Sequence, residues 1–269
     1  MKLVVDGREA YAYTGGKPFD PALPCVVFVH GALNDHSVWT LLARWFAHHG
    51  HSVLALDLPG HSRSEGPALA SVEEMALWLL RVLDAAGVAQ AALVGHSMGS
   101  LVALEAAARA PGRITRLVMV GTAYPMKVSD ALLGTARERP LAAIDMVVAF
   151  SHSTLAAKPS YPGPGMWQQG AARALMRRVQ DKASRTQGIN LFAHDFACCD
   201  RYTGGLEAAA KVSCPVHFVL GERDQMTLPK VTREIGAALK AQVATVPAGH
   251  AMMQETPDAV LAAVRAALA

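Results

Sequence analysis

Short runs of apolar residues alternate along the chain with longer segments in which apolar residues recur every three or four positions. The short runs are rich in valine and leucine, which is typical of strands buried on both faces of a parallel sheet. The longer segments have the spacing of helices with one apolar face. We expect strands at residues 24–29, 52–57, 114–120, 214–220 and 241–246, another beginning at residue 91, and an opening hairpin at 2–15. This order predicts an α/β fold, with a mostly parallel twisted sheet and helices on both faces.

Residues 124–206 interrupt the alternation. They contain no strand-like run, but they do contain helical patches, a segment rich in proline and glycine at 159–165, and many methionine and aromatic residues. We interpret this stretch as a helical insertion that forms a lid. The chain is therefore expected to divide into a first core part at 1–123, the lid at 124–206 and a second core part at 207–269.

Composition narrows the class of protein. The 269 residues are 52% hydrophobic and 17% charged, which suits one large buried core and excludes a disordered chain. A net charge of +3 without a dense lysine and arginine run gives no reason to expect a nucleic-acid partner. The first residues meet a charge too early for a secretory leader, and no long uncharged apolar run marks a membrane span. We expect a cytoplasmic protein without a membrane partner; its oligomeric state stays open.

The cysteines and histidines do not predict a metal site. Cys25, Cys198, Cys199 and Cys214 have neither the spacing of metal ligands nor that of a disulfide framework. The run at 48–51, His-His-Gly-His, is interpreted as the polar end of a helix and the loop after it. We therefore expect neither a metal nor an organic cofactor.

One motif joins the strand that begins at residue 91 to the segment after it. Gly95-x-Ser97-x-Gly99 lies between a buried apolar run and a helix rich in small residues. This is the context of a nucleophile elbow, in which a tight turn exposes a serine hydroxyl at the end of a strand. The glycines let the backbone approach its neighbours closely. The first amides of the following helix have no partner within the helix and can stabilise a negative charge.

A serine hydroxyl needs a base to take its proton, and the base needs an acid to orient it. Asp224 follows the expected strand at 214–220, and His250 follows the one at 241–246. Either residue alone is more often part of an ordinary turn or loop. Together with Ser97, in the order serine, acid, histidine and each at a strand end, they predict a catalytic triad. Glu222 is a weaker candidate for the acid.

On these motifs the chain resembles the α/β-hydrolase superfamily over nearly its whole length. His30-Gly31-Ala32 looks like the oxyanion loop of that family. Residues 57–64 look like its Asp-x-Pro-Gly-x-Gly-x-Ser signature, with Ser62 in place of the usual glycine. The resemblance implies an α/β-hydrolase fold and an oxyanion hole formed by the backbone amides of Ala32 and Met98.

Several further residues are candidates for the substrate pocket. His30 is interpreted as fixing the oxyanion loop through hydrogen bonds, and the His96 side chain as pointing away from the pocket to pack. Asn34 is interpreted first as a loop residue and second as a substrate contact. Methionine and aromatic side chains of the lid are expected to form an apolar ceiling. The candidates are His30, Asn34, His96, Met126, Phe150, Trp167 and Phe192.

These residues lead to a serine hydrolase that cleaves a carboxylic ester, a lactone or a similar small acyl compound. The same triad also serves C–C bond hydrolysis, perhydrolysis and acyl transfer in relatives, and the fold cannot choose among them. A serine at position 97 argues against haloalkane dehalogenases and epoxide hydrolases. The resemblance implies that those enzymes carry an aspartate as the nucleophile at this position. A ligand-binding receptor on the same fold is the alternative from another class.

Overall fold

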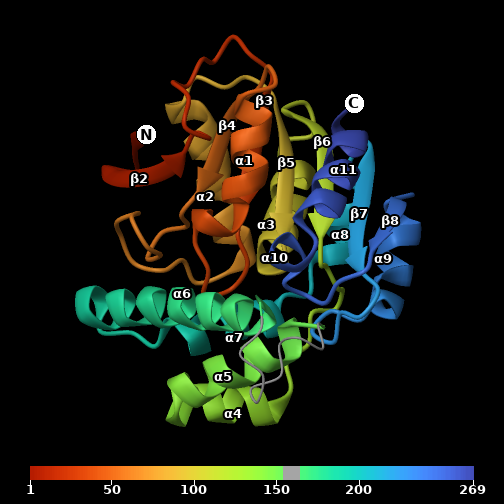
Figure 1. Cartoon of the computed structure of the whole chain (residues 1–269). Helices are drawn as coiled ribbons and strands as arrows, with labels where there is room; N and C mark the ends of the chain where they lie inside the picture. The colour runs from red at the N-terminus through yellow and green to blue at the C-terminus, as the bar shows by residue number, and fades with distance from the viewer. Residues whose placement is uncertain (154–163) are drawn as a thin grey trace.

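The computed structural model describes residues 1–153 and 164–269, and for 164–167 it describes the backbone alone. Within these residues, eight strands form one sheet in the order β1-β2-β4-β3-β5-β6-β7-β8 (Figure 1). The strands are β1 (Lys2–Val5), β2 (Arg8–Tyr13), β3 (Cys25–Val29), β4 (Ser52–Leu56), β5 (Ala91–His96), β6 (Ile114–Val120), β7 (Val216–Gly221) and β8 (Gln242–Val246).

The sheet is mostly parallel. Strands β4, β3, β5, β6, β7 and β8 pair in parallel. At the edge beside β4, β2 pairs antiparallel with both β4 and β1. The predicted α/β fold with a mostly parallel sheet is therefore confirmed. Because parallel strands share one direction, the loops that follow β3, β5, β7 and β8 all leave from the same edge of the sheet.

Helices cover both faces of this sheet. On one face lie α1 (Thr40–Ala47), α10 (Met252–Glu255), α11 (Pro257–Leu268) and the short 3-10 helix η1 (His36–Trp39). On the other lie α2 (Val72–Ala85), α3 (Met98–Arg109), α8 (Gly205–Ala209) and α9 (Arg233–Ala238), the last preceded by η3 (Pro229–Thr232).

Alternate residues of the central strands enter the two cores. In β3, Phe28 packs on Trp39 and Phe46, whereas Val27 faces the opposite core. Each large apolar side chain buried in this way contributes about 1.5–3 kcal/mol.

Four further helices lie across the carboxyl ends of the strands (Figure 1). They are α4 (Asp130–Glu138), α5 (Pro140–Ser151), α6 (Pro164–Gln187) and α7 (Leu191–Arg201), and we call them the cap helices. Ser129 caps the start of α4 and Asn190 that of α7, each accepting a backbone amide three residues on. Their apolar residues, such as Ile144 and Phe192, belong to the same core cluster as α2 and α3. The division of the chain at residues 124 and 206 stays a prediction.

No helix in the described ranges is both long enough and apolar enough to span a bilayer.

Candidate active site

The turn between β5 and α3 holds Ser97 in a strained backbone conformation. Its φ and ψ angles are 52° and −121°, a region that residues with a Cβ rarely adopt. Glycine is required at positions 95 and 99 because neighbouring backbone atoms come too close for a Cβ, and not because of a positive φ angle. A Cβ at Gly95 would overlap the backbone of Gly99, and a Cβ at Gly99 would overlap the carbonyl oxygens of Val29 and His30. The turn therefore fits only this pattern of small residues.

Asp224 and His250 meet at the ends of β7 and β8. His250 Nδ1 lies 2.8 Å from Asp224 Oδ2, and both side chains are almost fully buried. The other oxygen of Asp224 accepts the amides of Met226 and Thr227, each at 2.8 Å. Burial alone would raise the pKa of Asp224, but His250 and these hydrogen bonds lower it to about 2. The carboxylate is therefore ionised at neutral pH and fixes the proton of His250 on Nδ1.

Sequence reasoning missed Thr227 at this position. Its hydroxyl donates to Asp224 Oδ2 at 2.7 Å and lies 3.2 Å from His250 Nδ1. The signal was available in the sequence, because an aspartate followed closely by turn residues commonly accepts their backbone amides. Thr227 braces the contact between the acid and the histidine.

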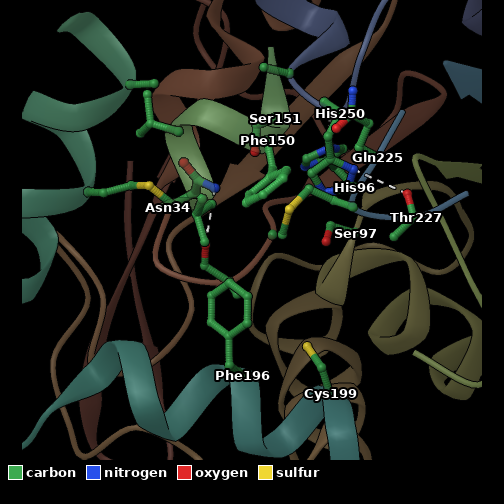
Figure 2. Close-up of a pocket in the computed structure, with 18 of the residues that line it drawn as sticks. Asn34, His96, Ser97, Phe150, Ser151, Phe196, Cys199, Gln225, Thr227 and His250 are labelled. Atoms are coloured by element: carbon green, nitrogen blue, oxygen red, sulfur yellow. Dashed lines mark hydrogen bonds between the residues drawn. The ribbon is translucent and has the colours of Figure 1, made fainter. Parts of the chain in front are cut away.

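Ser97 and His250 line the same cavity and lie at one side of it (Figure 2). In the described part of the chain no hydrogen bond joins the two side chains. Catalytic hydrogen bonds of free enzymes are often long and tighten only when substrate is bound. The arrangement therefore suits a serine that His250 deprotonates once an acyl group occupies the cavity.

Two backbone amides are free beside Ser97. Met98 is the first residue of α3, so its amide has no acceptor within the helix. The amide of Ala32 donates to no protein group among the residues that the structure describes. Free amides at these two positions can receive a developing oxyanion.

His30 lies behind the oxyanion loop rather than in the cavity. Its Nδ1 contacts Gly31 O at 2.8 Å, and its Nε2 accepts the Leu58 amide at 3.1 Å. It is fully buried and does not line the cavity, so its place among the pocket candidates was wrong. Its contacts are those of a residue that fixes the loop.

His96 is both a cavity wall and a support for His250. It lines the cavity, contrary to the expectation that it would point away, and its Nε2 donates to His250 O at 3.0 Å. Burial, followed by the charge of His250, lowers the pKa of His96 to about 3. A Cβ at Gly121 would lie 3.2–3.3 Å from both rings, so glycine leaves them room. His96 is therefore neutral and holds the backbone of His250.

Because His30 and His96 are neutral in the folded state, we expect acid to destabilise the fold. Burial, followed by the charge of His61, lowers the pKa of His30 to about 4, so neither His30 nor His96 is protonated in the folded state at pH 5. In the unfolded chain both titrate near 6.5 and bind protons as the pH falls. We expect the free energy of unfolding to decrease below pH 6.5, with a slope on the order of 2–3 kcal/mol per pH unit near pH 5.

Urea unfolding at several pH values between 6.5 and 5 measures this slope. Replacing His30 by asparagine removes one of the two groups and is expected to halve it. A wild-type slope near zero in that window would show that both histidines are protonated in the folded protein.

The cavity has a volume of about 360 Å³ and a chiefly apolar wall. Of the predicted candidates, Asn34, His96, Met126 and Phe150 line it. Phe192 does not: it is fully buried and stacks on Phe196, which does line the cavity. Trp167 lies outside the residues whose side chains are described. The apolar wall comes largely from the cap helices and includes Leu132, Met146, Val147, Val148, Ala172, Met176 and Phe196.

The loop at 57–64 is held by its first residue. Asp57 accepts the amide and Nδ1 of His36 on one oxygen, each at 2.8 Å, and the amide of Arg63 on the other at 3.0 Å. Asp35, His36 and Asp57 bring three potential metal-ligand atoms within 4.8 Å of one another. Asp35 in turn accepts Ser37 and Arg178. The two carboxylates serve as acceptors that shape two loops beside the sheet.

The comparisons with known proteins agree on one family. Residues 24–257 match the family model described as alpha/beta hydrolase fold. The sn-1-specific diacylglycerol lipase ABHD11 of Mus musculus is 26% identical over 257 residues, covering 93% of this chain and 82% of that protein. The enol-lactonase from Burkholderia xenovorans LB400 superposes with a TM-score of 0.81 at 23% identity, covering 100% of this chain and 99% of that one. At that identity the superposition shows the fold alone.

A higher identity is confined to part of the chain. The dihydrolipoyllysine-residue acetyltransferase component of the acetoin cleaving system from Cupriavidus necator is 37% identical over 131 residues. The matched stretch covers 48% of this chain and 32% of that protein, so the chain matches about a third of this relative's length.

Proposed function

Because this chain is an enzyme of the alpha/beta hydrolase fold family, we propose that it hydrolyses a small carboxylic ester through an acyl-enzyme on Ser97. One observation carries the proposal. The strained turn of Ser97 opens into the same cavity as His250, whose Nδ1 is held by Asp224 at 2.8 Å. Nucleophile, base and orienting acid are thereby in the order and at the strand ends that acyl transfer requires.

The reaction proceeds in two halves. His250 Nε2 takes the Ser97 proton as Oγ attacks the ester carbonyl, and the amides of Ala32 and Met98 receive the oxyanion. His250 then gives this proton to the leaving alkoxide, and the acyl group stays on Ser97. In the second half, His250 takes a proton from water, the hydroxide attacks the acyl-enzyme, and the carboxylic acid leaves as Ser97 is reprotonated.

The wall of the cavity favours a neutral, apolar acyl group. Among its described residues, Lys127 is the one lysine, arginine, aspartate or glutamate, and its ammonium donates to Asp200 O at 2.7 Å. A substrate with a buried carboxylate would need a cation facing it. Methionines such as Met126 and Met146 adapt to chains of different shape. An unbranched or cyclic hydrocarbon acyl group suits this surface.

The same groups could serve C–C bond hydrolysis, perhydrolysis or transfer of the acyl group to an acceptor other than water. The name of the Cupriavidus necator relative points to acyl transfer. Hydrolysis is preferred here because the one lysine or arginine among the described lining residues, Lys127, already donates to Asp200 O and is not free to hold a charged acceptor or a dicarboxylate. A receptor role would leave the free amides and the strained serine without use.

A series of p-nitrophenyl esters from acetate to decanoate tests the proposal. We expect kcat/KM to rise from acetate and to peak at a medium chain length. Each further methylene buried adds about 0.8 kcal/mol until a cavity of about 360 Å³ is filled. Mass spectrometry of the quenched enzyme should find the acyl group on the peptide that contains Ser97.

Adding alcohols or amines to the same assay separates hydrolysis from acyl transfer. Acyl transfer is the activity if an acceptor raises the release of p-nitrophenol well above the rate in water. A single stoichiometric burst without turnover, or binding without release of p-nitrophenol, would exclude the esterase and leave the receptor.

A further inference from the structure

A buried pair of side chains connects a cap helix to the core beside the oxyanion loop. Asp195 lies on α7, and its Oδ2 is 2.9 Å from His61 Nε2. The same oxygen accepts the backbone amide of Leu33 at 2.8 Å, across 162 residues of sequence. Both side chains of the pair are fully buried. Nothing in the proposed chemistry uses either of them.

The hydrogen bonds of His61 require its charged form. Its Nδ1 lies 3.1 Å from Pro59 O and its Nε2 faces the Asp195 carboxylate, so both ring nitrogens meet acceptors. A neutral imidazole can donate from only one nitrogen, whereas an imidazolium donates from both. Burial would lower the pKa of His61, but the charge and hydrogen bond of Asp195 raise it above its usual value. His30, whose tilted ring has its centroid 4.9 Å from that of His61, is the neutral one of the two.

The amide that Asp195 accepts belongs to a strained residue next to Ala32. Leu33 has a φ of 55°, in the left-handed region. The peptide between Ala32 and Leu33 is held at both ends, by Asp195 at its N–H and by Asn34 Nδ2 at its oxygen, 3.1 Å away.

The preceding peptide, from Gly31 to Ala32, is held at its oxygen alone. His30 Nδ1 contacts that oxygen at 2.8 Å, and the backbone N–H of Asn34 donates to it at 3.2 Å. Its N–H is the free amide of Ala32, which points away from these contacts because the peptide is trans. The direction of this amide therefore depends on the hydrogen bonds around it.

We propose that Asp195 is a positioning residue that holds the oxyanion loop in its working conformation by accepting the Leu33 amide, with the His61 imidazolium as its counter-ion. Helix α7 thereby supplies a part of the catalytic apparatus, besides a wall of the cavity. Without this acceptor the peptide between Ala32 and Leu33 keeps only its contact with Asn34 Nδ2 and can rotate, which relieves the strain at Leu33. The rotation displaces Asn34, whose backbone amide holds the preceding peptide, and so turns the Ala32 amide away from the oxyanion. The proposal rests on the proposed function, because it assigns the Ala32 amide to the oxyanion.

Two substitutions at one position separate the acceptor from the charge. Asp195→Ala removes both, and we expect kcat to fall about 10- to 100-fold with KM within about threefold of wild type. That loss is below the 10²–10³-fold typical of deleting an oxyanion donor outright. Asp195→Asn keeps an oxygen for the Leu33 amide, and we expect it to restore kcat to within about fivefold of wild type.

His194→Gln is the matched control. His194 is the neighbouring residue on α7, and its Nε2 donates across to the core at Leu69 O, at 2.8 Å. Its loss removes a contact between the cap and the core away from the oxyanion loop, so kcat should stay within about twofold. Active-site titration with a phosphonate gives the folded, competent fraction, and kcat is expressed per competent site.

The proposal is overturned if Asp195→Ala keeps its kcat, if its loss lies in KM alone, or if His194→Gln is affected equally. Nuclear magnetic resonance of ¹⁵N-histidine in the wild-type enzyme gives a readout that needs no activity. At pH 7 both nitrogens of His61 should carry protons, and a single protonated nitrogen would remove the counter-ion from the proposal. If wild type hydrolyses no ester, the proposed function fails, and the resonance of His61 still decides whether the buried pair is ionic.

Discussion

Replacing Ser97 by alanine is expected to lower kcat for the best p-nitrophenyl ester by about 10⁶-fold, the loss typical of removing the nucleophile of a triad. The change deletes one oxygen and leaves Asp224, His250 and both free amides in place. Alanine at a φ of 52° keeps the strain of the turn, so the fold should change little. Residual catalysis of 10³–10⁴-fold over water is expected from the oxyanion amides and from binding.

Ser100→Ala is the control for this prediction. Ser100 lies three residues further along, and its hydroxyl contacts Ser97 O at 2.6 Å and Thr122 Oγ1 at 2.8 Å, outside the cavity. We expect its kcat to remain within about tenfold of wild type, because the two hydrogen bonds lost, each worth about 1 kcal/mol, lie outside the cavity and support the fold. Residual activity of the Ser97 variant above about 1% of wild type would contradict the assignment of the nucleophile.

Asp224→Asn is expected to lower kcat by about 10⁴-fold with little change in KM. The asparagine oxygen can still accept the amides of Met226 and Thr227. Its NH2 group then faces His250 Nδ1 and donates to it, so the proton of the ring moves to Nε2. A histidine protonated on Nε2 has no lone pair for the Ser97 hydroxyl, and the base is lost although the geometry remains.

Glu222→Gln distinguishes this effect from a general loss of negative charge at the end of β7. Glu222 is two residues away and exposed, and it was the alternative acid from the sequence. The kcat of the Glu222→Gln variant should equal that of wild type. If Glu222→Gln lost the activity and Asp224→Asn kept it, the roles of the two acids would be exchanged.

The framework could be predicted because it depends on local patterns. The apolar runs at residues 24–29 and 114–120 mark buried strands, and parallel pairing then sends the segments after β5, β7 and β8 to one edge of the sheet. The placement of Ser97, Asp224 and His250 at a common edge follows from that topology. The strain at Ser97 also follows, because Gly95 and Gly99 allow an approach that a Cβ would block.

The contacts between the cap helices and the core could not be predicted in the same way. An amphipathic helix shows which face is apolar but not which loop its polar residues meet. Asp195 was an unremarked aspartate of a helix, and only the folded chain brings it to Leu33 and His61. The same limit applies to Phe192, which the sequence placed at the cavity and the structure places one layer deeper, behind Phe196.

The position of β8 at the edge of the sheet has a consequence for synthesis of the chain. Ser97 is translated before β7 and β8, and the loop that carries His250 follows β8, 153 residues after Ser97. A ribosome-bound chain can thus form the nucleophile turn long before any base reaches it. On the proposed mechanism, the growing polypeptide does not react with esters until β8 has joined the edge of the sheet and brought His250 to the serine.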